Sequence, residues 1–173
     1  MMRVLGIDPG SRITGYGIID VSAGGGSRYV DCGCIRAGEG ALPQRLKIIF
    51  QSLSEIIADV CPDAVAIESV FMNRNADSAL KLGRAQGAAM CAAVNQDLDV
   101  TEYTPAQVKQ AVVGKGNADK TQVQHMIKIL LGLSKTPQAD ASDALAVALT
   151  HVHTSQTLSR VSQVSTARQG RMR

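Results

Sequence analysis

One short segment limits the fold of this chain more than any other part of its sequence. Residues 64–67, AVAI, form a wholly apolar run that is followed by Glu68. A continuous apolar run of this length is typical of a parallel strand that is buried on both faces. The sequence therefore predicts a sheet that lies between two layers of helices, and the flanking segments must supply its other strands and those helices.

The flanking segments contain the required patterns in a consistent order. Strands are predicted over 3–8, 14–21, 28–36 and 99–103. Apolar residues at alternating spacings of four and three from Leu42 to Val60 predict an amphipathic helix. Further helices are predicted over 76–96, from Pro105, over 118–131 and over 137–153. This order predicts an α/β fold with a mixed five-stranded sheet, in which an antiparallel meander is extended by parallel strands and helices cover both faces.

Length and charge predict one domain and a separate tail. A chain of 173 residues with 45% hydrophobic residues is long enough for one domain with a substantial core. Residues 155–173 contain four arginines and no acid, and without these four the 18 basic residues become 14 against 15 acids. We therefore predict a domain over 1–154 and a basic, disordered tail over 155–173.

Compartment and cysteine usage lead to two further predictions. No apolar run reaches the roughly 18 residues needed to span a membrane, and the N-terminus lacks the layout of a secretory signal. We therefore predict a cytoplasmic protein with no membrane association. The four cysteines do not have the spacing of a zinc site, so we expect reduced and mostly buried thiols.

Four acidic residues interrupt apolar segments at chemically suggestive places. Asp8 and Glu68 each end a hydrophobic strand, and Asp140 and Asp143 lie three apart on an alanine-rich helix, where they share a face. Burial of a lone carboxylate is costly, so these four acids together predict a shared metal centre. Oxygen ligands favour Mg²⁺ or Mn²⁺, and two such ions can promote phosphodiester hydrolysis. Separate local roles stay open: Asp140 could interact with the helix dipole, and Glu68 could pair with Arg74 or Arg84.

Four segments of the chain resemble the sequence blocks of one family, the RuvC Holliday-junction resolvases. They are GIDPGSRITGYG (6–17), AIESVFMNRNADSALKLG (66–83), VKQAVVGKGNADKTQVQHM (108–126) and PQADASDALAVALTH (137–151). The resemblance implies an RNase H-like fold and a structure-selective endonuclease. Such an enzyme makes paired, symmetric nicks in strands of like polarity during homologous recombination and DNA repair.

The resemblance also assigns roles to individual residues. It implies that the acids at Asp8, Glu68, Asp140 and Asp143 form the catalytic centre and hold Mg²⁺, two ions per subunit, with Mn²⁺ able to substitute. It implies that Lys109 and Lys120 lie near the scissile phosphate and that Phe71 stacks on a base of the distorted junction. Arg74 and Lys81 are further candidates for contacts with the DNA backbone. The alternatives are that these lysines are simply solvated and that Phe71 belongs to the core.

Partners follow from the same resemblance. It implies four-way junction DNA as substrate, a homodimer, and the RuvA and RuvB branch-migration complex. Two symmetric nicks need two active sites, which a C₂ dimer of this chain would supply. Gly83 and Gly87 lie four apart in the predicted helix over 76–96 and would allow close approach of a second helix. The alternative is that this glycine face packs on the chain's own sheet.

Three other functions remain to be compared with this one. GIDPGS (6–11) also resembles the first phosphate loop of the sugar-kinase, Hsp70 and actin superfamily, which would make the chain a phosphotransferase. That hypothesis needs a second phosphate loop and leaves Asp140 and Asp143 unexplained. A non-catalytic junction-binding protein would need the basic residues and Phe71 but not four acids. Another RNase H-like nuclease, acting on RNA–DNA hybrids, would share the same catalytic centre.

Overall fold

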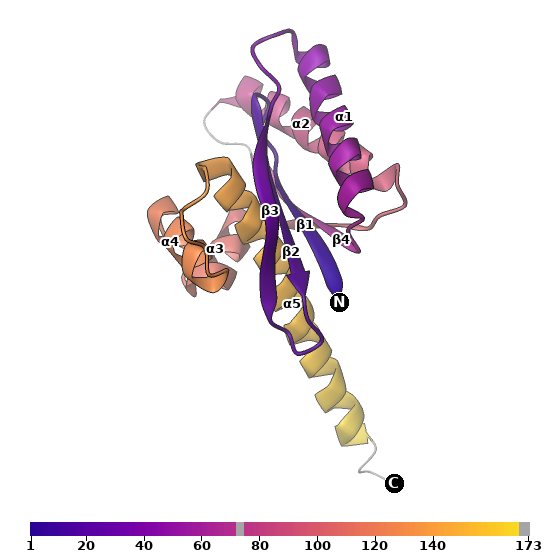
Figure 1. The fold of residues 1–173 in the computed structure, drawn as a ribbon, viewed down its shortest axis with the longest axis vertical. Coiled ribbons are helices and arrows are strands. Elements are labelled where there is room, and N and C mark those ends of the chain that lie inside the picture. The colour runs from indigo at the N-terminus through magenta and orange to yellow at the C-terminus, as the bar shows by residue number, and fades with distance from the viewer. Residues whose placement is uncertain (72–74, 170–173) are drawn as a thin grey trace.

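A computed structural model describes the backbone of residues 1–71 and 75–169, and the side chains of these residues as far as 158 (Figure 1). The elements in chain order are β1 (Met2–Asp8), β2 (Ile13–Val21), β3 (Ser27–Arg36), α1 (Leu42–Val60), β4 (Ala64–Glu68), α2 (Ala76–Val94), β5 (Val100–Tyr103), α3 (Pro105–Val113), α4 (Lys120–Leu130) and α5 (Ala139–Gln169). The strands form a five-stranded sheet in the order β3-β2-β1-β4-β5. β1, β2 and β3 pair antiparallel, whereas β4 pairs parallel with β1 and with β5. The predicted mixed sheet is therefore confirmed.

Helices cover both faces of the sheet, as expected from the apolar run in β4 (Figure 1). On one face, Leu5 and Ile7 of β1 pack in a core with buried residues of α1 and α2. On the other face, Val4 of β1 packs in a second core with α3, α4 and α5. Alternate residues of one strand thus enter different cores, which is the geometry of a strand buried on both sides.

Glycines in the sheet allow α5 to lie directly on the backbone of the two central strands. A Cβ atom at Gly6 of β1 would overlap the carbonyl oxygen of Ala144, and one at Gly17 of β2 would overlap Leu145. A Cβ atom at Gly15 of β2 would overlap the carbonyl oxygen of Asp140. Because no side chain separates helix from sheet at these points, the start of α5 has a fixed position relative to the ends of β1 and β2.

The last helix is longer than the sequence predicts. We predict a helix over 137–153 and a disordered tail from residue 155, whereas α5 runs from Ala139 to Gln169 and extends beyond the sheet (Figure 1). Residues 154–169 contain neither proline nor glycine, so nothing in this segment forces the helix to end. Within the described part of the chain, no helix, α5 included, combines the length and apolar character needed to cross a membrane.

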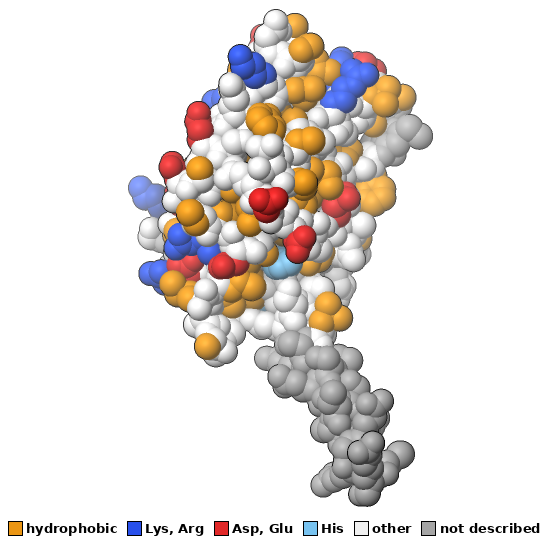
Figure 2. Space-filling model, turned by 90° about the vertical axis from the view of Figure 1, so that its right-hand side faces the viewer, with side chains coloured by type: hydrophobic (Ala, Val, Ile, Leu, Met, Phe, Trp, Pro, Cys, Tyr) orange, Lys and Arg blue, Asp and Glu red, His pale blue; other side chains and the backbone are white. Residues whose placement is uncertain are grey.

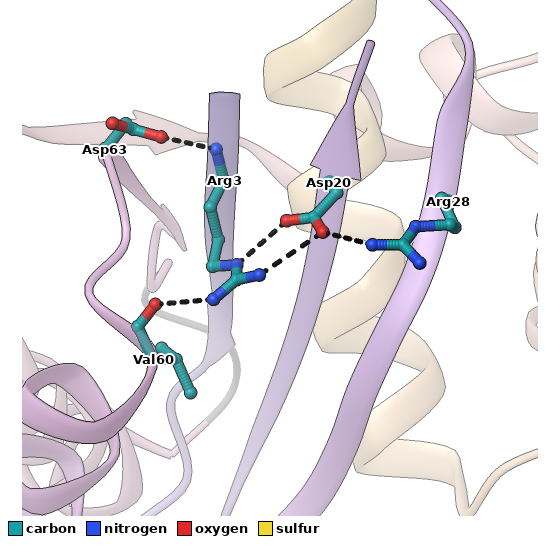
Figure 3. A network of polar contacts seen from close by, with 5 residues as sticks. All are labelled: Arg3, Asp20, Arg28, Val60 and Asp63. Carbon is teal, nitrogen blue, oxygen red and sulfur yellow. Dashed lines mark hydrogen bonds and ion pairs between the residues drawn. The ribbon is translucent and has the colours of Figure 1, made fainter. Parts of the chain in front are cut away.

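A polar network joins three strands and α1 at the edge where β1 begins (Figure 3). Asp20 of β2, whose side chain is only 2% exposed, accepts hydrogen bonds at 2.8 Å from Arg3 Nε and from Arg28 Nη2. Arg3 Nη1 also donates to the carbonyl oxygen of Val60 at 2.8 Å, and the Arg3 backbone amide donates to Asp63 Oδ2 at 2.6 Å. The hydrogen bond from Arg3, followed by the one from Arg28, keeps the pKa of Asp20 below its usual range.

The cysteines differ in part from the prediction. All four are free thiols, but Cys61 and Cys91 are exposed, while Cys32 and Cys34 are half-buried. The expectation of mostly buried thiols was therefore wrong. The exposure of Cys61 follows from its position as the left-handed residue that ends α1, where the chain turns at the surface.

Candidate active site

The parallel pairing of β1 and β4 brings the two strand-end acids together. Ile7 of β1 is in register with Ile67 of β4, and Asp8 and Glu68 are the next residues of their strands. Their side chains therefore leave the same edge of the sheet from adjacent strands. The two acids that the sequence predicts to share a site therefore lie at the ends of neighbouring strands.

The first turns of α5 carry the other two acids to the same edge. Gly15 of β2 is paired with Asp8, and the backbone of Asp140 lies directly against this glycine. Asp143 follows one helical turn later, and its side chain is 16% exposed. The close helix–sheet contact described above thus determines how near the acids of α5 come to the acids of the strands.

A cleft with a volume of about 190 Å³ lies between these acids and two further helices. Three acids, Asp8, Glu68 and Asp143, line it, and Lys109 of α3 and Lys120 of α4 contribute basic groups. Pro105, Val108 and Val123 complete the lining. Lys120 is the first residue of α4, and its Nζ atom donates to Asp143 Oδ2 at 3.2 Å. The cleft therefore combines three carboxylates with the two lysines that the sequence predicts near a phosphate.

Burial and nearby negative charge make two acids of the cleft, Asp8 and Glu68, unusually weak. Burial is the main cause that raises the pKa of Asp8 to about 8, and the charges of Glu68, Asp143 and Asp140 raise it further. Burial, followed by the charge of Asp143, raises the pKa of Glu68 to about 7, although Lys120 and Lys109 oppose this rise. Among the described residues, neither Asp8 nor Glu68 forms an ion pair. Without another cation, Asp8 would be largely protonated at neutral pH and Glu68 would be about half protonated.

The chemistry of this donor set fits a hard divalent cation. All the acids at the cleft offer oxygen atoms, and a cation there would relieve the charge repulsion that, after burial, raises the pKa values of Asp8 and Glu68. Within the described residues, no three acidic, histidine or cysteine groups converge closely enough to enclose an ion. The carboxylates instead line an open cleft, which leaves ligand positions for water and for a substrate oxygen.

The structure also bears on the separate local roles considered for Asp140 and Glu68, namely interaction with a helix dipole and pairing with an arginine. Asp140 does lie in the first turn of α5, where a negative charge is favourable, and it also adds to the charge around Asp8. Glu68 makes no ion pair with Arg84 among the described residues. Arg74 lies outside the described residues, so both its pairing with Glu68 and its contact with DNA remain predictions.

A second cleft with a volume of about 280 Å³ continues from the first and contains Phe71. Asp8 and Glu68 line both clefts, so the second one adjoins these two acids directly. The Phe71 side chain is 60% exposed, which shows that the alternative of a core residue was wrong. Its ring lies at the rim of a hollow beside the carboxylates, where it is accessible to a ligand.

The structure also shows the surroundings of Lys81 and of the two glycines that the sequence analysis singles out in α2. Lys81 of α2 pairs with Asp77 one turn earlier, and no contact brings it to either cleft. The glycine face of α2 does not pack on the sheet, because a Cβ atom at Gly83 or at Gly87 would meet no atom within 4 Å. The alternative interpretation of that face was therefore wrong, and nothing in the described part of the chain covers the two glycines.

Sequence reasoning missed one residue that contacts the backbone of the site. Gln86 of α2 donates from Nε2 to the carbonyl oxygen of Glu68 at 3.5 Å and to Glu102 Oε2 at 2.8 Å. This contact ties α2 to the end of β4. A glutamine in a helix has no distinguishing pattern, so only the packing of α2 against the strands identifies it.

Comparisons with known proteins agree with this geometry. The family described as Crossover junction endodeoxyribonuclease RuvC matches residues 4–151. Proteins of that name are 55% identical over 173 residues in Hahella chejuensis, covering 100% of both chains, and 60% identical over 166 residues in Aeromonas hydrophila, covering 96% of this chain and 95% of the relative. The structure of T. thermophilus RuvC in complex with a Holliday junction substrate has a TM-score of 0.85 at 34% identity and covers 91% of this chain and 96% of that chain. This chain therefore belongs to the RuvC family of crossover junction endodeoxyribonucleases and has its RNase H-like fold.

Proposed function

We propose that this chain is a Holliday-junction resolvase that makes paired, symmetric, metal-dependent nicks in strands of like polarity. The observation that carries this proposal is the cleft that Asp8, Glu68 and Asp143 line together with Lys109 and Lys120. Carboxylates hold the cation that phosphodiester hydrolysis needs, and lysines attract the phosphate. The T. thermophilus relative in complex with a Holliday junction substrate supports a four-way junction as the DNA that enters this cleft.

The carboxylates Asp8, Glu68, Asp140 and Asp143 would hold Mg²⁺, with two ions per subunit and Mn²⁺ as a substitute. When bound, such ions lower the pKa of a water molecule and stabilise the leaving oxygen of the phosphodiester. Lys120 bonds to Asp143 and faces the cleft, so it holds that carboxylate while adding positive charge for the phosphate. Lys109 also lines the cleft and adds a second positive charge.

Phe71 supplies selectivity for distorted DNA in this proposal. Its exposed ring lines the hollow that adjoins Asp8 and Glu68. A base stacked on an aromatic side chain gains about 1–3 kcal/mol, and only a base that has already left its own stack can use this gain without cost. Strand exchange at a junction exposes such bases, whereas intact duplex does not. Lys81 and Arg74 stay proposed contacts with the DNA backbone.

A homodimer would provide the second active site for the second nick. Along α2, the exposed residues Leu80, Gly83 and Val94 and the half-buried Gly87 share one helical face. Small residues in the middle of this face allow a second helix to approach, and the apolar ends supply area to bury. We also propose that this dimer acts in the cytoplasm with the RuvA and RuvB branch-migration complex.

Charge distribution fits recognition by shape rather than by a broad basic surface. On the face shown in Figure 2, lysine and arginine side chains stand in separate groups with acidic side chains between them. On this face, the attraction for phosphate is therefore concentrated at separate places, and the cleft itself holds two lysines. This distribution favours a substrate whose geometry brings a phosphate to those places.

The deciding experiment compares substrates and acid variants in Mg²⁺. We expect wild-type protein to nick a four-way junction and to leave a matched duplex and an RNA–DNA hybrid largely uncut. Asp8→Asn and Glu68→Gln should abolish nicking while keeping junction affinity, because they keep side-chain shape and remove charge. Asp59→Asn, an exposed acid of α1, is the matched control and should cut normally. Preferential cutting of the hybrid would favour the other RNase H-like activity, and normal cutting by Asp8→Asn would remove Asp8 from the centre.

A further inference from the structure

The loop that follows Asp8 has one tightly held conformation. The Gly10 amide donates to Thr14 Oγ1 at 3.3 Å, and the Thr14 hydroxyl donates back to the Gly10 carbonyl oxygen at 2.9 Å. The Ala37 amide donates to the carbonyl oxygen of Arg12 at 2.9 Å. A Cβ atom at Gly10 would overlap the backbone of Ile13, so the turn accepts no larger residue there. The direction in which Asp8 leaves β1 depends on this loop.

Arg45 adds a contact to the same loop from a different element. It lies in the first turn of α1, and its side chain is buried, with 9% of the residue exposed. Its Nη1 atom donates to the carbonyl oxygen of Ser11 at 2.8 Å and lies 3.5 Å from Ser11 Oγ. Arg45 thus fixes the loop to α1 at a position three residues after Asp8.

Stability alone does not explain an arginine at this position. A buried cation loses its hydration, and among the described residues Arg45 has no ion-pair partner to compensate. Its Nε atom is buried without a hydrogen-bond partner in the described structure. A positive charge in the first turn also opposes the dipole of α1, which has no acidic residue there and no side-chain cap. An unbranched apolar side chain would avoid all three costs.

We propose that Arg45 is a positioning residue for Asp8. By holding the Ser11 carbonyl, it keeps the loop and the end of β1 in place, so that the Asp8 carboxylate stays at the cleft despite repulsion from Glu68 and Asp143. The inference rests on the proposed function in one respect, since it assumes that Asp8 holds a divalent cation. Loss of a group that orients a metal ligand typically lowers metal affinity or activity about 10–100-fold.

The test measures Mn²⁺ affinity by calorimetry in Arg45→Met, Arg45→Lys and wild-type protein. Each is measured at a temperature at which its own melting curve shows it to be fully folded. We expect Arg45→Met to bind Mn²⁺ about 10–100-fold more weakly than wild type, and Arg45→Lys, which keeps a donor, to lie between them. Arg28→Met is the matched control, because Arg28 also bonds to a buried partner but lies at the edge of the sheet where β1 begins. It should bind Mn²⁺ normally.

The outcomes separate this inference from the proposed function. Wild-type Mn²⁺ affinity in folded Arg45→Met would overturn the positioning role, as would an equal loss of affinity in Arg28→Met. In either case junction cleavage by the wild-type enzyme would still support the resolvase. If Arg45→Met bound Mn²⁺ weakly but the wild-type protein did not cut junctions, the positioning role of Arg45 would be supported. The proposed function as a resolvase would then be contradicted. If the wild-type chain bound no Mn²⁺, the metal centre itself would be contradicted.

Discussion

Replacing Asp8 with asparagine should make the metal-free protein more stable. The pKa of Asp8 is about 8 in the folded protein, mainly because of burial, against 3.8 as the ordinary value. A carboxylate with a raised pKa favours the folded state fully below about pH 4, and this contribution is lost as the pH rises through about 8. The difference of about 4 in pKa corresponds to at most about 6 kcal/mol. The asparagine of Asp8→Asn does not ionise, so the variant does not lose this contribution to its free energy of unfolding at high pH.

The assay is urea unfolding in a chelator, followed by circular dichroism, at pH 5 and at pH 9. At pH 9 we expect the free energy of unfolding of Asp8→Asn to exceed that of wild type by several kcal/mol, within the limit of about 6. At pH 5 the gap should be much smaller, because wild-type Asp8 is largely protonated. Added Mg²⁺ should stabilise wild type alone and narrow the gap, since only its carboxylate cluster binds the ion tightly.

If Asp8→Asn were no more stable than wild type at pH 9 without metal, the carboxylates would not be repelling one another in a desolvated cluster. A gap of the same size at pH 5 and pH 9 would point to packing rather than charge. Asp59→Asn, at an exposed site, should show no change at either pH and controls for the general effect of removing an acid.

Three further predictions concern other parts of the molecule. Phe71→Ala should keep the wild-type melting temperature, because the ring is exposed, yet cleave junctions slowly in a single-turnover assay; a large fall in melting temperature would contradict the stacking role. Asp20→Asn should lower the free energy of unfolding by about 2 kcal/mol, since it weakens charged hydrogen bonds from Arg3 and Arg28, while the cleavage rate stays near wild type. Gly87→Leu should weaken dimerisation in sedimentation experiments, because the side chain would enter the free face of α2; an unchanged dimer would place the interface elsewhere.

The four acids could be predicted from the sequence because short segments determine both their secondary structure and the direction of their side chains. Asp8 and Glu68 were predictable as partners because each ends an apolar strand, and parallel neighbours place such ends side by side. Asp140 and Asp143 were predictable as a pair because helical spacing places them on one face. In these cases a short segment determines both the element and the direction of the side chain.

Contacts between distant segments could not be predicted in this way. The bond between Lys120 and Asp143 joins two helices, and the spacing of the two residues in the sequence does not indicate it. Arg45 is one of several polar residues in an amphipathic helix, and its burial depends on where the β1–β2 loop lies. The length of α5 was underestimated because its polar composition after residue 154 is typical of a tail, although nothing in it ends a helix.

The direct contact of α5 with Gly6, Gly15 and Gly17 affects how this protein can change over time. In most cores a larger side chain at one position can be accommodated by a smaller one at its neighbour. Here the neighbours of Gly6 are backbone atoms and the methyl group of Ala148, which leave almost nothing to remove. Substitutions elsewhere in the core can be compensated by changes in neighbouring side chains, whereas at Gly6 and Gly15 the neighbours are mainly backbone atoms, which no substitution removes. The positions of the four acids can thus stay the same while other residues of the core are substituted during evolution.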